Sequence, residues 1–322
     1  MITLTKIREL DLLDTGDAEA PRHVSVASGL ACAGSSIYVV ADDELHLGVF
    51  AAAGNAPGRL LRLFDGALPA EKAARKKQKP DLEAITPLPP FGDCPNGALL
   101  ALGSGSKRNR CRGAVLRLDA HGAIDGAPRI IDVSPLFEEL DHHIRALNIE
   151  GAVAIGDELR LLQRANKKRP RNAIVHYPLA AILAALTSGG AIGAITPSAI
   201  DPVDLGDIDG VPLSFTDGAG LPDGSIVFTA VAEDTEDTYN DGVCLGAAIG
   251  VAARDGTVRF FERLDECHKI EGVAARVDNN VIRLLLVTDA DDPAIPASLF
   301  SAALPIQHKR NRIAHPSHSF FT

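Results

Sequence analysis

The sequence contains no tryptophan and only 4% aromatic residues, so its core has to be built from small aliphatic side chains. It also has no uninterrupted apolar run long enough to cross a bilayer, which argues against a membrane protein. Positive charge is not in excess either. The formal net charge is −10, which argues against general nucleic-acid binding.

Features of exported proteins are missing as well. The five cysteines are scattered, odd in number and without a CxxC pair, which is typical of reduced thiols and not of a disulfide framework. The first 17 residues contain no apolar segment of the kind found in signal peptides. Both observations predict a cytoplasmic protein.

What the sequence does contain is a repeated pattern: one acidic residue, or a serine in its place, heads a short apolar run, which is followed by a tight turn and a second strand. The leading residues are separated by 55, 67, 67 and 54 positions. Regular periods of this size indicate a propeller or a solenoid, with one supersecondary unit in each repeat. The five leading residues are Ser28, Glu83, Glu150, Asp217 and Glu271.

The repeats contain short apolar segments separated by turn residues, which predicts an all-β protein with four-stranded blades. The fifth repeat, Glu271 to Leu304, shows only three strands. The N-terminal segment Ile2–Leu12 can supply the fourth and close the ring, which would bury the two apolar faces of an open gap. We therefore predict a five-bladed β-propeller spanning residues 1–306, followed by a disordered basic tail over residues 307–322.

In a propeller, the first strand of each blade lines the central channel, so the five leading residues are expected to form a ring. Two carboxylates about 6 Å apart repel each other by roughly 3 kcal/mol at an effective dielectric constant of about 20. Four acids in one channel therefore need protonation or a cation. An oxygen-only ligand set favours calcium over zinc. The alternative is that these acids contact water in an open channel.

The loops that follow the second strand of each blade are expected to surround the ring. Blade one contributes the acids Asp42 and Asp43, whereas blades two and three contribute basic residues. The basic residues are Lys107, Arg108, Arg164 and Lys167. A metal ion beside arginine and lysine suits an anionic small molecule such as a phosphate or a carboxylate. The alternative is that these charges only contact solvent.

These residues resemble the calcium-activated nucleotidase (apyrase) family, whose members are five-bladed propellers with a central calcium ion. In that family a serine and several glutamates from the innermost strands surround the calcium, and Ser28, Glu83, Glu150 and Glu271 stand at matching positions. Asp217 occupies the fifth position, where the family has a serine. The acidic pair in blade one and Arg164 in blade three are similar to that family too. The pattern is also similar to phytase-like bacterial propellers of unassigned function.

Three functions remain open from the sequence. The first is a calcium-dependent hydrolase of a phosphate ester or anhydride, with Asp42 or Asp43 as the general base and with Arg164, Lys107 and Arg108 neutralising the phosphoryl group. The second is a non-catalytic propeller whose structural calcium supports binding of an anionic ligand or a protein partner. The third is an esterase or lactonase, which the basic loops disfavour.

Overall fold

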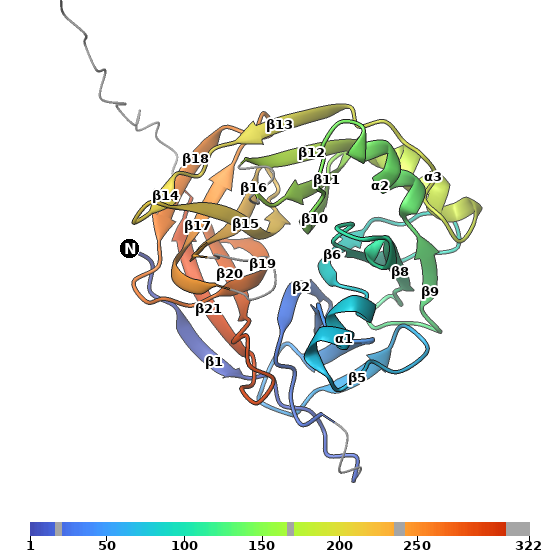
Figure 1. Cartoon of the computed structure of the whole chain (residues 1–322), viewed down its shortest axis with the longest axis horizontal. Coiled ribbons are helices and arrows are strands. Elements are labelled where there is room, and N and C mark those ends of the chain that lie inside the picture. Colours follow the sequence, from blue (N-terminus) through green and yellow to red (C-terminus); the bar gives the residue numbers. More distant parts are fainter. Residues whose placement is uncertain (17–20, 166–170, 235–241, 307–322) are drawn as a thin grey trace, which may run out of the picture.

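The computed structural model describes residues 1–16, 21–165, 171–234 and 242–306. Within these ranges the strands form five antiparallel sheets arranged around a central axis (Figure 1). The predicted tail over residues 307–322 lies outside the described residues, as does Lys167. The sheets are the blades of a propeller, so the predicted fold class is confirmed.

Each of the first three blades runs in chain order from the channel outwards. Blade one consists of β2 (Ala27–Ala33), β3 (Ser36–Ala41), β4 (His46–Ala51) and β5 (Arg59–Arg62). Blade two consists of β6 (Leu82–Leu88), β7 (Ala98–Gly103), β8 (Arg112–Arg117) and β9 (Arg129–Asp132). Blade three consists of β10 (Ile149–Ile155), β11 (Glu158–Gln163), β12 (Asn172–Pro178) and β13 (Ala199–Val203).

The last two blades depart from this pattern. Blade four consists of β14 (Asp207–Ile208), β15 (Val211–Gly220), β16 (Ile226–Asp234), β17 (Val243–Ala252) and β18 (Val258–Arg263), so the short β14 makes it five-stranded. Blade five consists of β19 (Ile270–Asp278), β20 (Val281–Thr288), β21 (Ser298–Pro305) and β1 (Thr5–Glu9). The inner strands β2, β6, β10, β15 and β19 contact one another in sequence and form the closed ring.

The N-terminal strand closes the ring as predicted. β1 pairs with β21 in antiparallel register, with Thr5 opposite Ser301 and Glu9 opposite Ser298. Beyond β1 the chain continues onto blade one, where Gly58 donates its amide hydrogen to Asp11. The segment therefore joins the last blade to the first.

Inner strands are rich in glycine and alanine because they approach each other closely at the axis. A Cβ atom on Gly29 would lie 2.8 Å from the carbonyl oxygen of Glu83 in blade two. One on Gly272 would lie 3.0 Å from the amide nitrogen of Leu30 in blade one. Small residues at these positions thus follow from the size of the ring.

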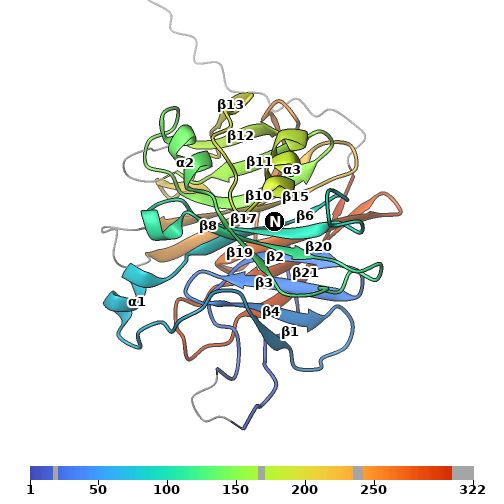
Figure 2. The ribbon, with the colours of Figure 1, turned by 90° about the vertical axis from the view of Figure 1, so that its right-hand side faces the viewer.

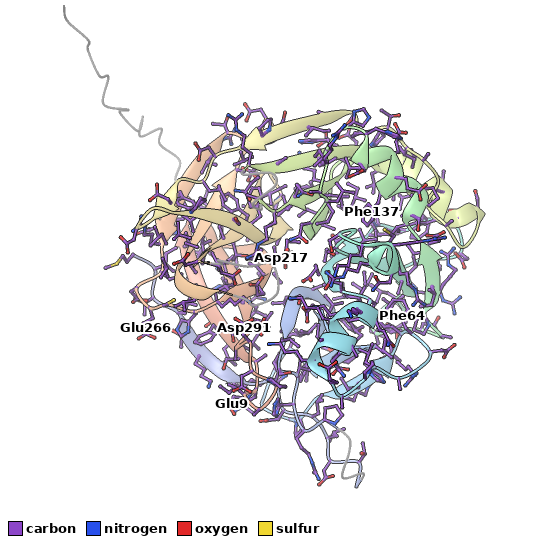
Figure 3. All side chains as sticks on the ribbon, in the orientation of Figure 1. Glu9, Phe64, Phe137, Asp217, Glu266 and Asp291 are labelled. Carbon is purple, nitrogen blue, oxygen red and sulfur yellow. The ribbon has the colours of Figure 1, made fainter. Side chains whose placement is uncertain are left out.

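The apolar core lies between the blades. In the described part of the chain, the buried hydrophobic residues group into five clusters, and each cluster joins two neighbouring blades. Figure 3 labels Phe64 and Phe137, which belong to two of these clusters. Phe64 lies in the cluster between blades one and two, and Phe137 lies in the cluster between blades two and three. Aliphatic side chains make up most of each cluster, as the scarcity of aromatic residues requires.

Among the described residues, three α-helices connect or cover the blades: α1 (Lys72–Gln78), α2 (Ser134–Asp141) and α3 (Leu179–Ser188). Glu71 caps α1 by accepting the amide hydrogens of Ala73 and Ala74. Figure 2 shows α1 and α2 at the same end of the channel. None of the helices in the described ranges has the length and apolarity that a bilayer crossing requires.

Leu10→Ala is expected to destabilise the protein by about 2–5 kcal/mol, because Leu10 is fully buried in the cluster between blades five and one. Leu13→Ala is the matched control, since Leu13 is 54% exposed and its truncation should cost less than about 0.5 kcal/mol. Urea unfolding of both variants measures the difference. Equal losses of stability would contradict the closure of the ring by this segment.

A network of charges links blades three and four on the outer part of the ring. Arg254 lies 3.0 Å from one carboxylate oxygen of Glu158, and the other oxygen accepts from Arg160 at 2.8 Å. Nδ1 of His176 lies 3.2 Å from that second oxygen. Burial by itself would raise the pKa of Glu158, but the hydrogen bonds from Arg160, Arg254 and His176 lower it to about 2. The ionised form of Glu158 is therefore favoured by folding.

A depressed pKa in the folded state gives stability that is present above the unfolded pKa and is lost as the pH falls through the folded value. The free-energy difference of unfolding between the wild type and Glu158→Gln should therefore be largest above about pH 4.5. It should shrink as the pH falls from there towards 2. Urea titrations at several pH values measure this difference. A difference that does not change with pH would show that the carboxylate charge of Glu158 contributes nothing.

Candidate metal centre

Every inner strand carries a β-bulge, at its second residue in four blades and in the middle of the longer β15. The pairing register shifts there in each blade, which leaves one extra residue in the inner strand. A bulge re-aims the side chain of the extra residue, so five bulges at equivalent positions define one ring of side chains. The five bulge residues are Ser28, Glu83, Glu150, Thr216 and Glu271.

The structure corrects one member of the predicted ring. In blade four the register shifts between Phe215 and Asp217, so the ring position belongs to Thr216. The Thr216 hydroxyl donates to the carbonyl oxygen of Ile270 at 2.7 Å. The prediction aligned the repeats on acid–glycine pairs. In blade four this pair, Asp217 and Gly218, begins one residue after the bulge.

Asp217 instead contacts three blades near the centre of the propeller, where Figure 3 labels it. Its two carboxylate oxygens accept the amide hydrogens of Gly218 at 2.7 Å and Val273 at 2.8 Å. Burial raises the pKa of Asp217 well above its usual range, while hydrogen bonds from Val273, Gly218 and Leu30 oppose this rise. These partners lie in blades four, five and one, so Asp217 has a structural role in the channel.

Two cations of the chain sit among the ring glutamates. Nη1 of Arg164 lies 3.4 Å from Glu150 and 3.9 Å from Glu271, and Nη2 lies 2.5 Å from Glu233. Lys269 lies 3.2 Å from Glu233 and 3.8 Å from Glu271. The predicted proximity of Arg164 to the ring is thus present, and Glu233 and Lys269 are members that were not predicted as site residues.

These cations do not fully offset the burial of the acids. Burial raises the pKa of Glu150 to about 7, against the opposing effect of Arg164. Burial also raises the pKa of Glu271 well above its usual range, and Lys269 and Arg164 oppose it. Burial likewise raises the pKa of Glu83 well above its usual range, and the charge of Glu150 adds to this rise. The ring therefore favours either protonation of its acids or a further positive charge.

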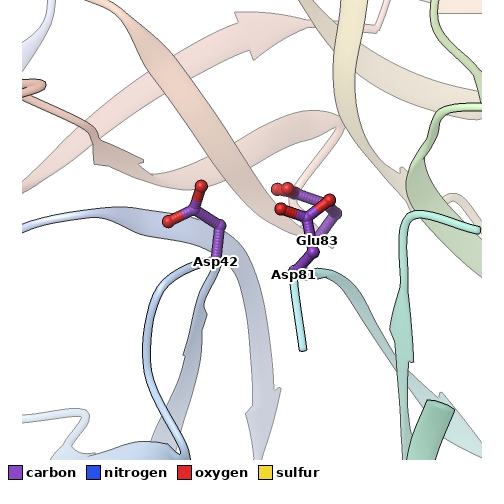
Figure 4. Close-up of side chains that lie close together, drawn as sticks. All are labelled: Asp42, Asp81 and Glu83. Atoms are coloured by element: carbon purple, nitrogen blue, oxygen red, sulfur yellow. The ribbon is translucent and has the colours of Figure 1, made fainter. Parts of the chain in front are cut away.

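A second group of acids adjoins the ring at Glu83. Carboxylate oxygens of Asp42, Asp81 and Glu83 lie within 4.8 Å of one another (Figure 4). Asp42 comes from blade one, whereas Asp81 and Glu83 come from blade two. Lys79 forms ion pairs with Asp42 and, at 3.0 Å, with Asp81. Oxygen ligands at such separations match the irregular coordination that calcium accepts.

Asp81 is held in this cluster by strong local constraints. Its φ of 57° lies in the left-handed region, which is unusual for a residue with a side chain. Its buried carboxylate accepts from Ser104 at 2.5 Å and from Arg110 at 2.7 Å. The repeat pattern does not single out Asp81, although aspartate adopts the left-handed region more often than most residues.

The two acids predicted in blade one have different surroundings. Asp42 belongs to the cluster, and its Oδ1 is buried without a hydrogen-bond partner among the described residues. Burial raises the pKa of Asp42 to about 6, Lys79 opposes the rise, and Asp81 adds to it. Asp43 faces away towards α1, where its Oδ2 accepts from Arg75 at 3.1 Å.

The basic loop of blade two contributes a different residue from those predicted. Lys107 and Arg108 are exposed, and Arg108 begins the short 3₁₀ helix η1 (Arg108–Arg110). Arg110, at its end, is buried and pairs with Asp81. In this loop the structure therefore assigns the inward position to Arg110.

Comparison with known families matches residues 23–304 to the family of unknown function DUF6929. The chain belongs to this family. A comparison with curated protein sequences finds no match. The ring of bulge residues and the adjoining cluster of Asp42, Asp81 and Glu83, together called the channel mouth, lie within the matched range.

Solved structures with a similar fold include an α-L-arabinofuranosidase from Podospora anserina in complex with cellotriose. It has a TM-score of 0.50 and 12% sequence identity, covering 95% of this chain and 98% of that chain. An α-L-arabinanase from Penicillium chrysogenum, in complex with arabinobiose, has a TM-score of 0.43 and 8% identity over 95% and 98% of the two chains. A luciferin-regenerating enzyme has a TM-score of 0.43 and 11% identity over 92% and 95%. At these identities the likeness of the DUF6929 protein to them concerns the fold alone.

Proposed function

We propose that the channel mouth binds calcium and hydrolyses a phosphate ester or anhydride. The observation that carries the proposal is that the ring of bulge residues, which would hold the ion, adjoins the acids Asp42 and Asp81 through Glu83. The donor set consists of oxygen atoms, which suits a hard cation. A buried carboxylate oxygen of Asp42 and one of Glu271 have no hydrogen-bond partner among the described residues, so both are available to a ligand.

The bulge residues Ser28, Glu83, Glu150 and Glu271 would hold the ion. They are the residues that match the calcium-activated nucleotidase pattern, and this resemblance supports calcium over other hard cations. When bound, the ion would supply a positive charge that polarises a phosphoryl oxygen. The fifth bulge residue, Thr216, uses its hydroxyl hydrogen for Ile270 and is not needed as a donor.

In the proposed reaction, Asp42 acts as the general base. Its free Oδ1 accepts a proton from the attacking water, and a pKa raised to about 6 suits a base that works near neutral pH. Lys79 and Arg164 lie beside these acids and can neutralise the charge that develops on the phosphoryl oxygens. Asp81, fixed by Ser104 and Arg110, orients Lys79.

Calcium is expected to raise the melting temperature of the full chain relative to a chelator. A ligand that binds only the folded state stabilises it by about 2.7 kcal/mol at a hundredfold excess over its Kd. Glu83→Gln should shrink the shift, because it removes a charge shared by the ring and the acidic cluster. Glu9→Gln is the control, since Glu9 is exposed on the outermost strand. Equal melting temperatures with calcium and with chelator would contradict the metal site.

A non-catalytic role is the second candidate, and one observation favours it. Lys79, Arg110, Arg164 and Lys269 all pair directly with acids of the mouth, as in a structural network. Phosphate release from nucleoside diphosphates, nucleoside triphosphates and inositol phosphates separates the two candidates. A calcium-dependent melting shift without release from any of them would favour a propeller that uses calcium to bind an anionic ligand or a protein.

A further inference from the structure

Two cysteines distant in sequence meet at the junction of blades four and five. Cys244 lies on β17, and Cys267 lies in the segment that leads from β18 to β19. The thiol of Cys267 donates to the backbone carbonyl oxygen of Cys244, with a sulfur–oxygen distance of 2.8 Å. The sulfur of Cys267 therefore lies against the backbone of Cys244, and the two thiols are also within hydrogen-bonding reach of each other.

The two thiols differ in their access to solvent. Cys267 is exposed and lines a cavity of about 510 Å³ together with His268, Lys269 and Phe300, so a small molecule can reach it. Cys244 is half-buried. Burial raises the pKa of the Cys244 thiol to about 12, and its hydrogen bond with the thiol of Cys267 adds to the rise. Cys244 is thus the less reactive thiol, placed directly behind the more accessible one.

We propose that Cys244 and Cys267 form a reversible disulfide by exchange with a small-molecule disulfide of the glutathione class. The thiolate of Cys267 attacks one sulfur of that disulfide and releases one small thiol. Cys244 then loses its proton and attacks the Cys267 sulfur of the mixed disulfide, which expels the second small thiol. In total, two protein thiols are oxidised to one disulfide and one small disulfide is reduced to two thiols.

The position of this pair connects it to the channel mouth. Cys244 is the register partner of Glu233 in the pairing of β16 with β17. Cys267 precedes Lys269 by two residues, and Lys269 lies 3.2 Å from Glu233. The disulfide would join the two segments that carry this ion pair, so it would fix one side of the mouth.

The test uses the full chain equilibrated with oxidised and reduced glutathione at several ratios in the presence of a chelator, so that it does not depend on calcium or on phosphate release. Under oxidising ratios we expect two of the five thiols to be lost. Peptide mass spectrometry should place a bond between Cys244 and Cys267. Reduction should restore all five thiols. A cross-link closing a loop of this size should raise the melting temperature by about 5 °C.

Three cysteine variants make the test specific. Cys244→Ser should trap glutathione on Cys267, because the second step is lost. Cys267→Ser should abolish the bond, whereas Cys32→Ser, which removes another exposed thiol, should leave it unchanged. The proposal is overturned if five thiols persist at every ratio, or if the bond maps to another pair. It is also overturned if the wild type retains glutathione on Cys267 as stably as Cys244→Ser does.

Discussion

Asp42→Asn is expected to slow phosphate release by a hundredfold or more, since general bases typically contribute that much to the rate. The substitution keeps the size of the side chain and removes its ability to take a proton. Folding should change little, because Lys79 keeps a second ion pair, with Asp81, when the charge of Asp42 is removed. Rates under saturating substrate, with calcium present, measure the effect.

Asp43→Asn is the matched control for this variant. Asp43 is the next residue in the same turn, but its carboxylate is bound by Arg75 and does not belong to the cluster with Glu83. We expect its rate to fall by less than about tenfold, because no proton transfer is assigned to it. If both variants lose activity equally, the base is not Asp42 alone. If neither does, the proposed mechanism is wrong.

Arg164→Ala is expected to change two quantities in opposite directions. Arg164 places its positive charge between Glu150 and Glu271, where it repels a bound cation. Removing that charge should tighten calcium binding about tenfold or more, even with strong solvent screening. Turnover should nevertheless fall about a hundredfold, because the phosphoryl group loses a stabilising charge.

Isothermal titration with calcium and the phosphate assay measure these two effects of Arg164→Ala separately. Arg108→Ala serves as the control, since Arg108 is exposed on η1 and should alter neither quantity by more than about twofold. A joint fall in calcium affinity and turnover would show that Arg164 only holds the glutamates in place. Tighter calcium binding with unchanged turnover would remove Arg164 from the reaction while leaving the metal site intact.

The architecture could be predicted because it depends on patterns that are local in the sequence. Short apolar runs separated by turn residues define the strands, and their recurrence defines the blades. The closing strand followed from a count, since the fifth repeat lacked one strand and the segment Ile2–Leu12 was left over. The ring position in blade four was predicted one residue too late, at Asp217 instead of Thr216. A bulge shifts the register by one residue, and the position of the shift depends on pairing with the next strand, which a repeat pattern does not contain.

The site was predicted less completely than the fold because several of its members depend on contacts between distant segments. Asp81 owes its place to a left-handed backbone and to contacts with Ser104 and Arg110. In the run from Lys107 to Arg110, the sequence offers three basic residues with the same chemistry, and the turn of η1 decides which one points inwards. Lys269 immediately precedes the start of β19, and the repeat pattern assigns no role to the residue at this position.

The strand that completes blade five, β1, has a consequence for the order in which the propeller folds during its synthesis. Residues Thr5–Glu9 are synthesised before the other strands of the propeller, yet their partner β21 begins only at Ser298. Until β21 has been made, β1 therefore has no strand to pair with. Leu10 and Leu12, which follow β1, belong to the apolar cluster that blade one shares with blade five. The ring can close only after nearly the whole propeller has been made. The stability that depends on the closed ring is therefore gained late, because β1 and β21 are far apart in the sequence. A circular permutant that joins β21 directly to β1 would make the two partners neighbours and remove this delay.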